Sequence, residues 1–189
     1  MRDFIESGYR FIFGTEWEIM KYDSHRFYTS LSGHSMSGVD FAGILDRDKV
    51  VLLEIKNYKQ YDHQLPEKTL QQFKSEIEEK ALDSLQLINV IYKFLNRKWQ
   101  YKVFYGIVRK YSILNKEWYF WSELYRIGVE ERKLHFVLLL DAYFNTDQIK
   151  RELNKSIGGE FTDVEVISLR DKTAIKELKI DISKVFKAH

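Results

Sequence analysis

Residues 37–61 read SGVDFAGILDRDKVVLLEIKNYKQY, and this stretch decides how the whole chain is interpreted. It contains two apolar segments, 39–45 and 50–56, separated by the polar run 46–49. Apolar runs of this length on either side of a short polar turn are typical of a β-hairpin. We therefore expect residues 39–56 to form two paired antiparallel strands.

Three charged side chains interrupt these apolar segments. Asp40 lies near the start of the first, and Glu54 and Lys56 lie near the end of the second. Because side chains alternate across a strand, Glu54 and Lys56 should share one face while Ile55 points to the other. The hairpin folds Asp40 back to the level of Glu54. Buried charges are costly unless they are paired or bind a metal, so these residues predict a functional site.

Two carboxylates and one ammonium group at one end of a sheet suit phosphate chemistry. Carboxylates with open coordination positions favour a hard divalent cation that keeps several waters, such as Mg²⁺ or Mn²⁺. Such an ion can lower the pKa of a bound water and stabilise the charge that develops on a phosphate. The lysine could orient or deprotonate the attacking water, or stabilise the charged phosphorus centre.

The pattern Gly-Val-Asp at 38–40, then residues 41–53, then Glu-Ile-Lys at 54–56, resembles the signature of the PD-(D/E)XK nuclease superfamily. The resemblance covers residues 10–110 at most, and Val39 stands where the family name has proline. It implies the α/β restriction-endonuclease-like fold, with an αβββαβ core whose mixed central sheet is flanked by helices. It also implies a Mg²⁺- or Mn²⁺-dependent endonuclease that hydrolyses DNA and leaves 5′-phosphate ends.

The same resemblance assigns roles to the residues of the motif. Asp40 and Glu54 would hold the metal, together with the backbone carbonyl of Ile55, and Lys56 would position or activate water. Many relatives carry a further acid on a helix before the first core strand. The segment GTEWE at 14–18 resembles that helix start and would add Glu18 to the catalytic and metal-binding residues.

Other residues near the motif fit two interpretations each, one functional and one structural. Thr15 and Glu18 also fit a capping box, in which the glutamate closes a helix start, and Glu16 and Glu6 are the remaining candidate acids. Substrate contacts are expected from residues close to the motif or on the following helix. Lys80 also fits a solvated helix face, and the loop at 32–38 also fits a plain connection between two elements. These tentative substrate-binding residues are Asn57, Lys59, Lys80 and His34.

Periodicity and turn residues predict the remaining elements. Helices are expected at 2–12, 15–22, 69–97, 146–156 and from Asp171 onward. Strands are expected at 26–31, 101–109, 134–142 and 163–169. An apolar stripe on the 69–97 helix should pack in the core and consists of Phe73, Ile77, Leu82, Leu85, Ile88, Ile91, Tyr92 and Leu95. We expect a single domain over 1–189, with the core at about 10–110 and a C-terminal βαβ extension at about 111–189 that joins the same sheet.

Composition limits the class of protein. The chain has 189 residues, 44% of them hydrophobic, so it can bury a substantial core. It has no cysteine, which excludes disulfides and thiolate metal sites and suits a cytoplasmic protein. Neither a membrane span nor a phosphate-binding loop for a nucleotide cofactor is present in the sequence. The net charge of +2 does not by itself demand nucleic acid.

The partners and the alternatives remain open at this stage. We expect DNA as substrate, with RNA as an alternative, and a homodimer because a double-strand cutter often needs two active sites. The aromatic segment at 117–125 could form that interface, stack on bases or pack in the core. A rival hypothesis is a catalytically silent nucleic-acid- or protein-binding module on the same fold. A third makes the protein a nuclease subunit or toxin of a defence or mobile-element system.

Overall fold

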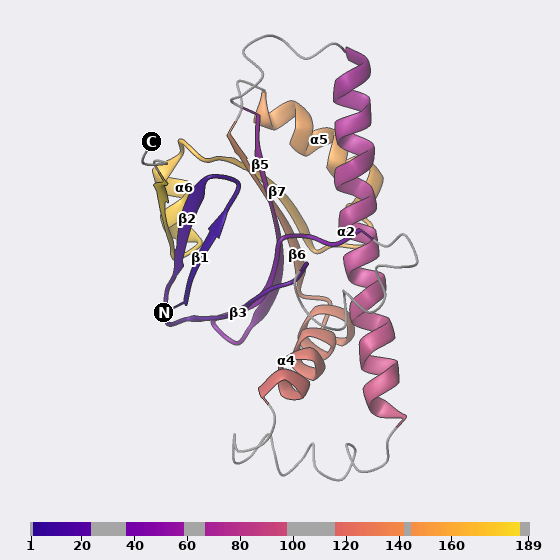
Figure 1. Ribbon diagram of the computed structural model, residues 1–189. Coiled ribbons are helices and arrows are strands. Elements are labelled where there is room, and N and C mark those ends of the chain that lie inside the picture. The colour runs from indigo at the N-terminus through magenta and orange to yellow at the C-terminus, as the bar shows by residue number, and fades with distance from the viewer. Residues whose placement is uncertain (1, 24–36, 59–66, 98–115, 142–144, 186–189) are drawn as a thin grey trace.

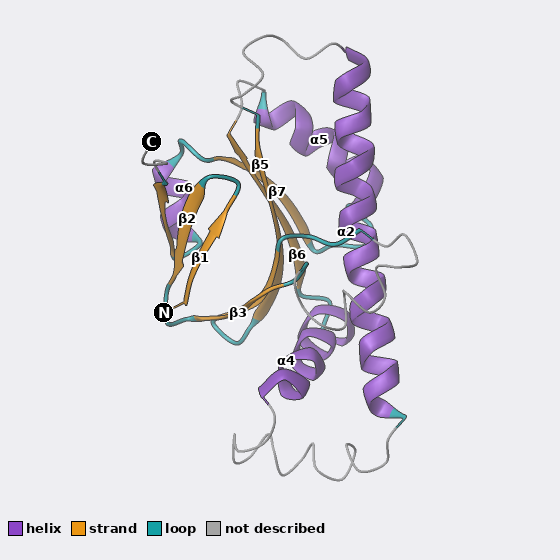
Figure 2. Cartoon of the chain, viewed as in Figure 1, coloured by secondary structure: helices purple, strands orange, loops and turns teal. Residues whose placement is uncertain are grey.

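The computed structural model describes residues 2–23, 37–58, 67–97, 116–141 and 145–185. These residues form a mixed α/β fold in three layers (Figure 1). A five-stranded mixed sheet lies in the middle, helices cover one of its faces, and a three-stranded sheet with a short helix covers the other (Figure 2). The expected mixed sheet flanked by helices is confirmed at this level of description.

The central sheet has the strand order β3-β4-β5-β6-β7. Its strands are β3 (Trp17–Lys21), β4 (Phe41–Leu45), β5 (Lys49–Asn57), β6 (Leu134–Asp141) and β7 (Asp163–Ser168). β3, β4 and β5 pair antiparallel, whereas β5, β6 and β7 pair parallel. The predicted hairpin is confirmed, as are the two C-terminal strands and their place in the same sheet.

The turn between β4 and β5 explains the register of the hairpin. Asp46 and Arg47 have positive φ angles of 54° and 57°, as the central residues of a type I′ turn do. The Asp48 N–H donates to the Leu45 carbonyl and closes the turn. Every residue of β4 is buried, which explains the continuous apolar sequence of a strand that is covered on both faces.

Helices α2 (Glu67–Asn96), α4 (Lys116–Tyr125) and α5 (Thr146–Ile157) cover one face of the central sheet, and the π-helical turn η2 (Arg126–Glu130) continues α4 (Figure 1). The predicted helices at 69–97 and 146–156 are confirmed. The predicted core stripe of α2 is wrong at Leu82, which is 40% exposed. Ala81 is buried instead, because it follows Ile77 by four residues while Leu82 lies about 100° further round the helix.

The N-terminal segment forms strands, so the helices expected at 2–12 and 15–22 are wrong. Residues 2–12 belong to the antiparallel hairpin of β1 (Arg2–Glu6) and β2 (Tyr9–Phe13). Ser7 and Gly8 both have positive φ, 49° and 80°, so the glycine marks a hairpin turn and not a helix end. Buried and more exposed residues alternate along β2, which is the period of a strand.

The C-terminal segment after β7 is only partly the helix that was expected from Asp171 onward. A short helix, α6 (Lys172–Glu177), is capped by Asp171, whose side chain accepts from the Thr173 and Ala174 N–H groups. The chain then forms β8 (Ile180–Lys184), which pairs antiparallel with β2. The second sheet therefore has the order β1-β2-β8 and joins the two ends of the described chain.

Two hydrophobic clusters lie on opposite faces of the central sheet. One packs β4, β5 and β6 against α2, α4 and α5, and the other packs the same strands against β2, β8 and α6. The strands predicted at 26–31 and 101–109 lie outside the described residues. Among the described residues, no helix has the length and apolar character needed to cross a membrane.

Candidate functional site

The strand β5 presents Glu54 and Lys56 on the face covered by α2. Ile55 belongs to the hydrophobic cluster on the opposite face, as the alternation of a strand predicts. Glu54 is fully buried, whereas the Lys56 side chain is 18% exposed. The sheet therefore holds a charged pair at the boundary between the core and solvent.

Asp40 comes directly before β4 and reaches the same place from the neighbouring strand. In the β4–β5 register Phe41 pairs with Leu53, so continuing that register sets Asp40 opposite Glu54. The Ile55 N–H donates to the Asp40 carboxylate Oδ2 over 2.7 Å. Asp40 is only 8% exposed. The sequence prediction that the hairpin folds Asp40 back to Glu54 agrees with this register.

Helix α2 supplies two further charged groups to the site. Lys80 Nζ lies 2.8 Å from Glu54 Oε1, and Lys56 Nζ lies 3.3 Å from the same oxygen. Lys56 also donates to Glu76. Glu54 Oε2 is buried and accepts no hydrogen bond from any described residue. Lys80 therefore lies in the site and is not part of a solvated helix face.

Burial favours a higher pKa for the two acids and a lower pKa for the lysine. Loss of hydration, followed by the nearby charge of Glu54, raises the pKa of Asp40 to about 7. Burial also raises the pKa of Glu54, although Lys80 and Lys56 oppose this shift. Burial alone would lower the pKa of Lys56, but its contacts with Glu76 and Glu54 outweigh burial and raise it to about 12. Lys56 is therefore a cation at neutral pH, which favours orienting water or stabilising charge over deprotonating water.

An acidic cluster lies on the side of Asp40 that faces the N-terminal hairpin. Carboxylate oxygens of Glu6, Asp23 and Asp40 lie within 4.8 Å of one another. Lys21 Nζ lies 2.9 Å from Glu6 Oε2. Sequence reasoning gave Glu6 little weight and did not consider Asp23, because residues 2–12 were expected as a helix. The Ser7-Gly8 turn is the signal that could have identified the hairpin and placed Glu6 at its tip.

Glu18 does not lie near Asp40. It pairs with Ile44 in the β3–β4 register, whereas the Tyr22 N–H donates to the Asp40 carbonyl. Four residues of strand, or roughly 13 Å, separate these two levels. The Glu18 carboxylate lies 3.7 Å from Arg47 at the hairpin turn. The capping-box reading is also wrong, because Trp17–Lys21 is a strand.

The remaining predicted residues have different outcomes. The Asn57 amide donates to the Ser7 carbonyl over 3.0 Å, while Lys59 and His34 lie outside the described residues. Glu16 lies on the turn before β3, where Thr15 Oγ1 is 3.4 Å from its carboxylate. The aromatic segment at 117–125 lies in α4, where three of its rings are buried, so core packing accounts for them: Trp118, Phe120 and Trp121.

No family model, no curated protein and no solved structure matches the chain.

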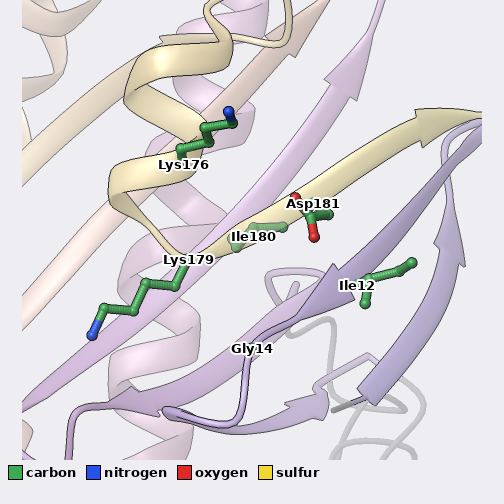
Figure 3. A pocket seen from close by; sticks show the side chains of 6 residues that line it. All are labelled: Ile12, Gly14, Lys176, Lys179, Ile180 and Asp181. Carbon is green, nitrogen blue, oxygen red and sulfur yellow. The ribbon is translucent and has the colours of Figure 1, made fainter.

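A hollow of about 170 Å³ lies between β2, α6 and β8, near the turn end of the β4–β5 hairpin (Figure 3). Lys176 and Lys179 line it, but their side chains extend in different directions. Lys179 Nζ lies 2.7 Å from the Asp46 carboxylate. The hollow therefore lacks converging polar groups of the kind that Asp40, Glu54 and the two lysines form.

Proposed function

We propose that this protein is a Mg²⁺- or Mn²⁺-dependent endonuclease of the PD-(D/E)XK type that hydrolyses phosphodiester bonds in DNA. The observation that carries the proposal is the antiparallel register that sets Asp40 opposite Glu54, with Lys56 on the same face of β5 as Glu54. This arrangement meets the requirement for two acids and a cation at one sheet end. The shared burial of the two acids makes a purely solvated charge pair a poor explanation.

The order of the elements supports the proposal. Three antiparallel strands, β3, β4 and β5, are followed by the long helix α2, then by α4 with its π-helical turn η2, and then by β6, which lies parallel to β5. The PD-(D/E)XK core is expected to begin with a helix and to continue with three strands, a helix and a fourth strand. From β3 onward the strands and α2 follow this order, whereas the described residues directly before β3 form the strands β1 and β2. β3 would then be the first core strand, and β6, which was predicted as an extension, would be the fourth.

The acidic side chains fit a hard divalent cation. The donors are carboxylate oxygens, and Glu54 Oε2 is a buried acceptor that no described residue satisfies. Asp40 and Glu54 would hold the ion, with the Ile55 carbonyl as an expected further ligand. Glu6 or Asp23, whose carboxylates lie near Asp40 in a cluster that does not include Glu54, would supply the third acid in place of Glu18. When bound, such an ion supplies an acidified water and offsets charge on the phosphate.

The lysines would then act on the substrate and on the acids. Lys56, held between Glu54 and Glu76, would orient the attacking water or donate to a phosphate oxygen as charge builds up. Lys80 would keep Glu54 ionised in its buried position, because its ammonium group lies 2.8 Å from the carboxylate. Both roles need these lysines as cations.

The same network also favours a second candidate function. Glu54 is balanced by Lys56 and Lys80, and Glu76 in turn contacts Lys56, so the charges can be satisfied within the protein. A catalytically silent binding module could keep such a network for stability alone. This candidate predicts DNA or protein binding without cleavage. The homodimer and the cytoplasmic location stay predictions.

The deciding experiment compares cleavage of supercoiled, linear, single-stranded and branched DNA with Mg²⁺, Mn²⁺ or EDTA. Glu54→Gln should abolish cleavage, and Glu18→Gln, a matched acid on the same sheet, should leave it intact. Binding of Mn²⁺ measured by calorimetry gives a readout that is independent of activity. Metal-dependent cleavage that survives in Glu54→Gln would exclude the proposed site, and binding without any cleavage would favour the silent module.

A further inference from the structure

The end of the central sheet at which Lys56 lies has a second charged cluster on its opposite face. Asp141 ends β6 and pairs with Asn57 in the β5–β6 register. Because side chains alternate, Asn57 and Asp141 point away from the face that carries Glu54 and Lys56. The two clusters therefore lie on opposite faces of the sheet, at the same ends of β5 and β6.

Asp141 lies beside a buried ring and an exposed cation. It is 1% exposed, accepts a hydrogen bond from the Tyr9 hydroxyl, and lies 3.7 Å from Arg170 Nε. Lys184 Nζ lies 5.8 Å from the centre of the Tyr9 ring, within the range of a cation–π contact. Arg170 and Lys184 are both exposed to solvent. A buried carboxylate and a buried ring thus each lie beside one cation at the surface.

The N-terminal hairpin joins this cluster to the proposed metal site. Glu6, in the acidic cluster with Asp40, and Tyr9, in contact with Asp141, are Cα partners on either side of the Ser7-Gly8 turn. Directly opposed residues of an antiparallel pair have Cα atoms about 4.5–5.5 Å apart. The Ser7-Gly8 turn therefore lies between Glu6, which is near Asp40, and Tyr9, which is near the two cations.

We propose that Arg170 and Lys184 form a phosphate-binding flank that holds the nucleic-acid backbone beside the site on Asp40, Glu54 and Lys56. This inference rests on the proposed function, because it assigns the flank to the same substrate. An arginine fork matches the geometry of a phosphate, and the buried Asp141 carboxylate 3.7 Å away attracts the Arg170 guanidinium to this end of the sheet. The buried acids repel a phosphate strand, so cations on the flank would compensate for that repulsion.

The test measures binding of a fluorescein-labelled duplex DNA in EDTA, where no cleavage interferes, at salt concentrations from 50 to 200 mM. The variants are Lys184→Gln and Arg170→Gln, with Lys176→Gln as control. Lys176 is also exposed, but it lines the hollow at the far end of the second sheet (Figure 3). Each lost phosphate contact should lower the slope of log affinity against log salt by about 0.9. The fall in affinity over this range should then be smaller by roughly 3.5-fold per contact.

The outcomes separate this inference from the function on which it rests. Lower slopes for Lys184→Gln and Arg170→Gln, with a wild-type slope for Lys176→Gln, support the flank. Lys184→Gln does not touch Asp141, so it keeps the test valid if Arg170→Gln folds poorly. Slopes equal to wild type in both variants, with the DNA still bound, would overturn the flank and leave the nuclease proposal standing. Wild-type protein that binds no DNA at 50 mM salt would overturn the flank, and the cleavage assay with Mg²⁺ or Mn²⁺ would then decide the nuclease proposal by itself.

Discussion

At one end of the β3–β4–β5 sheet the charged side chains are exposed to solvent, and at the other end the carboxylates of Asp40 and Glu54 are buried. At the turn end, Asp46 pairs with Lys179 and Asp48 with Lys133, and all four side chains are at least 39% exposed. At the other end, the buried Glu54 is shared by Lys56 and Lys80. Charge alone therefore does not distinguish the two ends of the sheet, whereas burial of the charged groups does. Exposed pairs such as those at the turn contribute about 0–1 kcal/mol each.

The largest expected effect is on catalysis. Asp40→Asn keeps the shape of the side chain but removes a negative charge from the proposed metal site. We expect metal-dependent DNA cleavage to fall by about 1,000-fold, near the upper end of what one electrostatic group contributes. Asp46→Asn at the turn end should change the rate by less than about twofold, as a typical surface substitution does. Equal losses in initial-rate assays of the two variants would remove the distinction between the two ends.

The second effect is on the pH dependence of stability. Folding raises the pKa of Asp40 from 3.8 to about 7, so the folded protein keeps a proton that the unfolded chain releases. The contribution of this carboxyl to the free energy of unfolding is fully present below about pH 4. It is lost as the pH rises to 7, and the loss amounts to up to about 4 kcal/mol. Urea denaturation between pH 5 and 8 should show this fall in wild type and not in Asp40→Asn.

Asp48 provides the control for that measurement at the other end of the sheet. Its contact with Lys133 lowers its pKa, so the stability it contributes is present above the unfolded pKa of 3.8 and is lost only as the pH falls further. Asp48→Asn should therefore keep the wild-type slope between pH 5 and 8. A slope that persists in Asp40→Asn would assign it to another group.

The third effect compares lysines at the two ends. Lys80→Gln removes one of the two cations that compensate the buried Glu54, and we expect the free energy of unfolding to fall by about 1–3 kcal/mol. Lys179→Gln breaks an exposed pair and should cost less than about 1 kcal/mol. Chemical denaturation at pH 7 measures both. A larger cost at Lys179 would reverse the comparison.

The smallest effect tests which acid completes the metal site. Glu6→Gln should weaken Mn²⁺ binding by about 10-fold, at the low end of the 10–100-fold that supporting residues of metal sites contribute. Glu18→Gln should leave the affinity unchanged, because Glu18 lies at the turn beside Arg47. Calorimetric titration of both proteins gives the answer. Weaker binding in Glu18→Gln alone would favour the acid that the sequence motif suggests.

Sequence reasoning succeeded where the period of apolar residues and the turn agreed. The 39–56 hairpin and the α2 helix have long, unmixed patterns, so their type and the positions of Glu54 and Lys56 followed directly. The site was predicted as far as it depends on that hairpin. Lys80 was a weaker candidate because its helix position alone fits solvent equally well, and only packing of α2 on β5 brings it to Glu54.

Sequence reasoning failed where the decisive contacts are distant along the chain. Residues 2–12 have a mixed pattern that fits a helix, and the contact that makes them a sheet comes from β8. Glu6 therefore could not be placed beside Asp40. Asp141 and Arg170 were missed for the same reason, because each is an ordinary strand-end residue until Tyr9 packs against Asp141.

The pairing of β2 with β8 has a consequence for the timing of assembly in the cell. The residues of β2 (Tyr9–Phe13) are synthesised before those of β8 (Ile180–Lys184), so β2 has no β8 partner until the long stretch of chain between them has been made. At typical rates of protein synthesis, of about 5–20 residues per second, the delay is roughly 10–30 s. The central hairpin can fold on the ribosome earlier. We expect Glu6 to reach Asp40 only after β8 has left the exit tunnel, so that a nascent chain carries an incomplete acidic cluster.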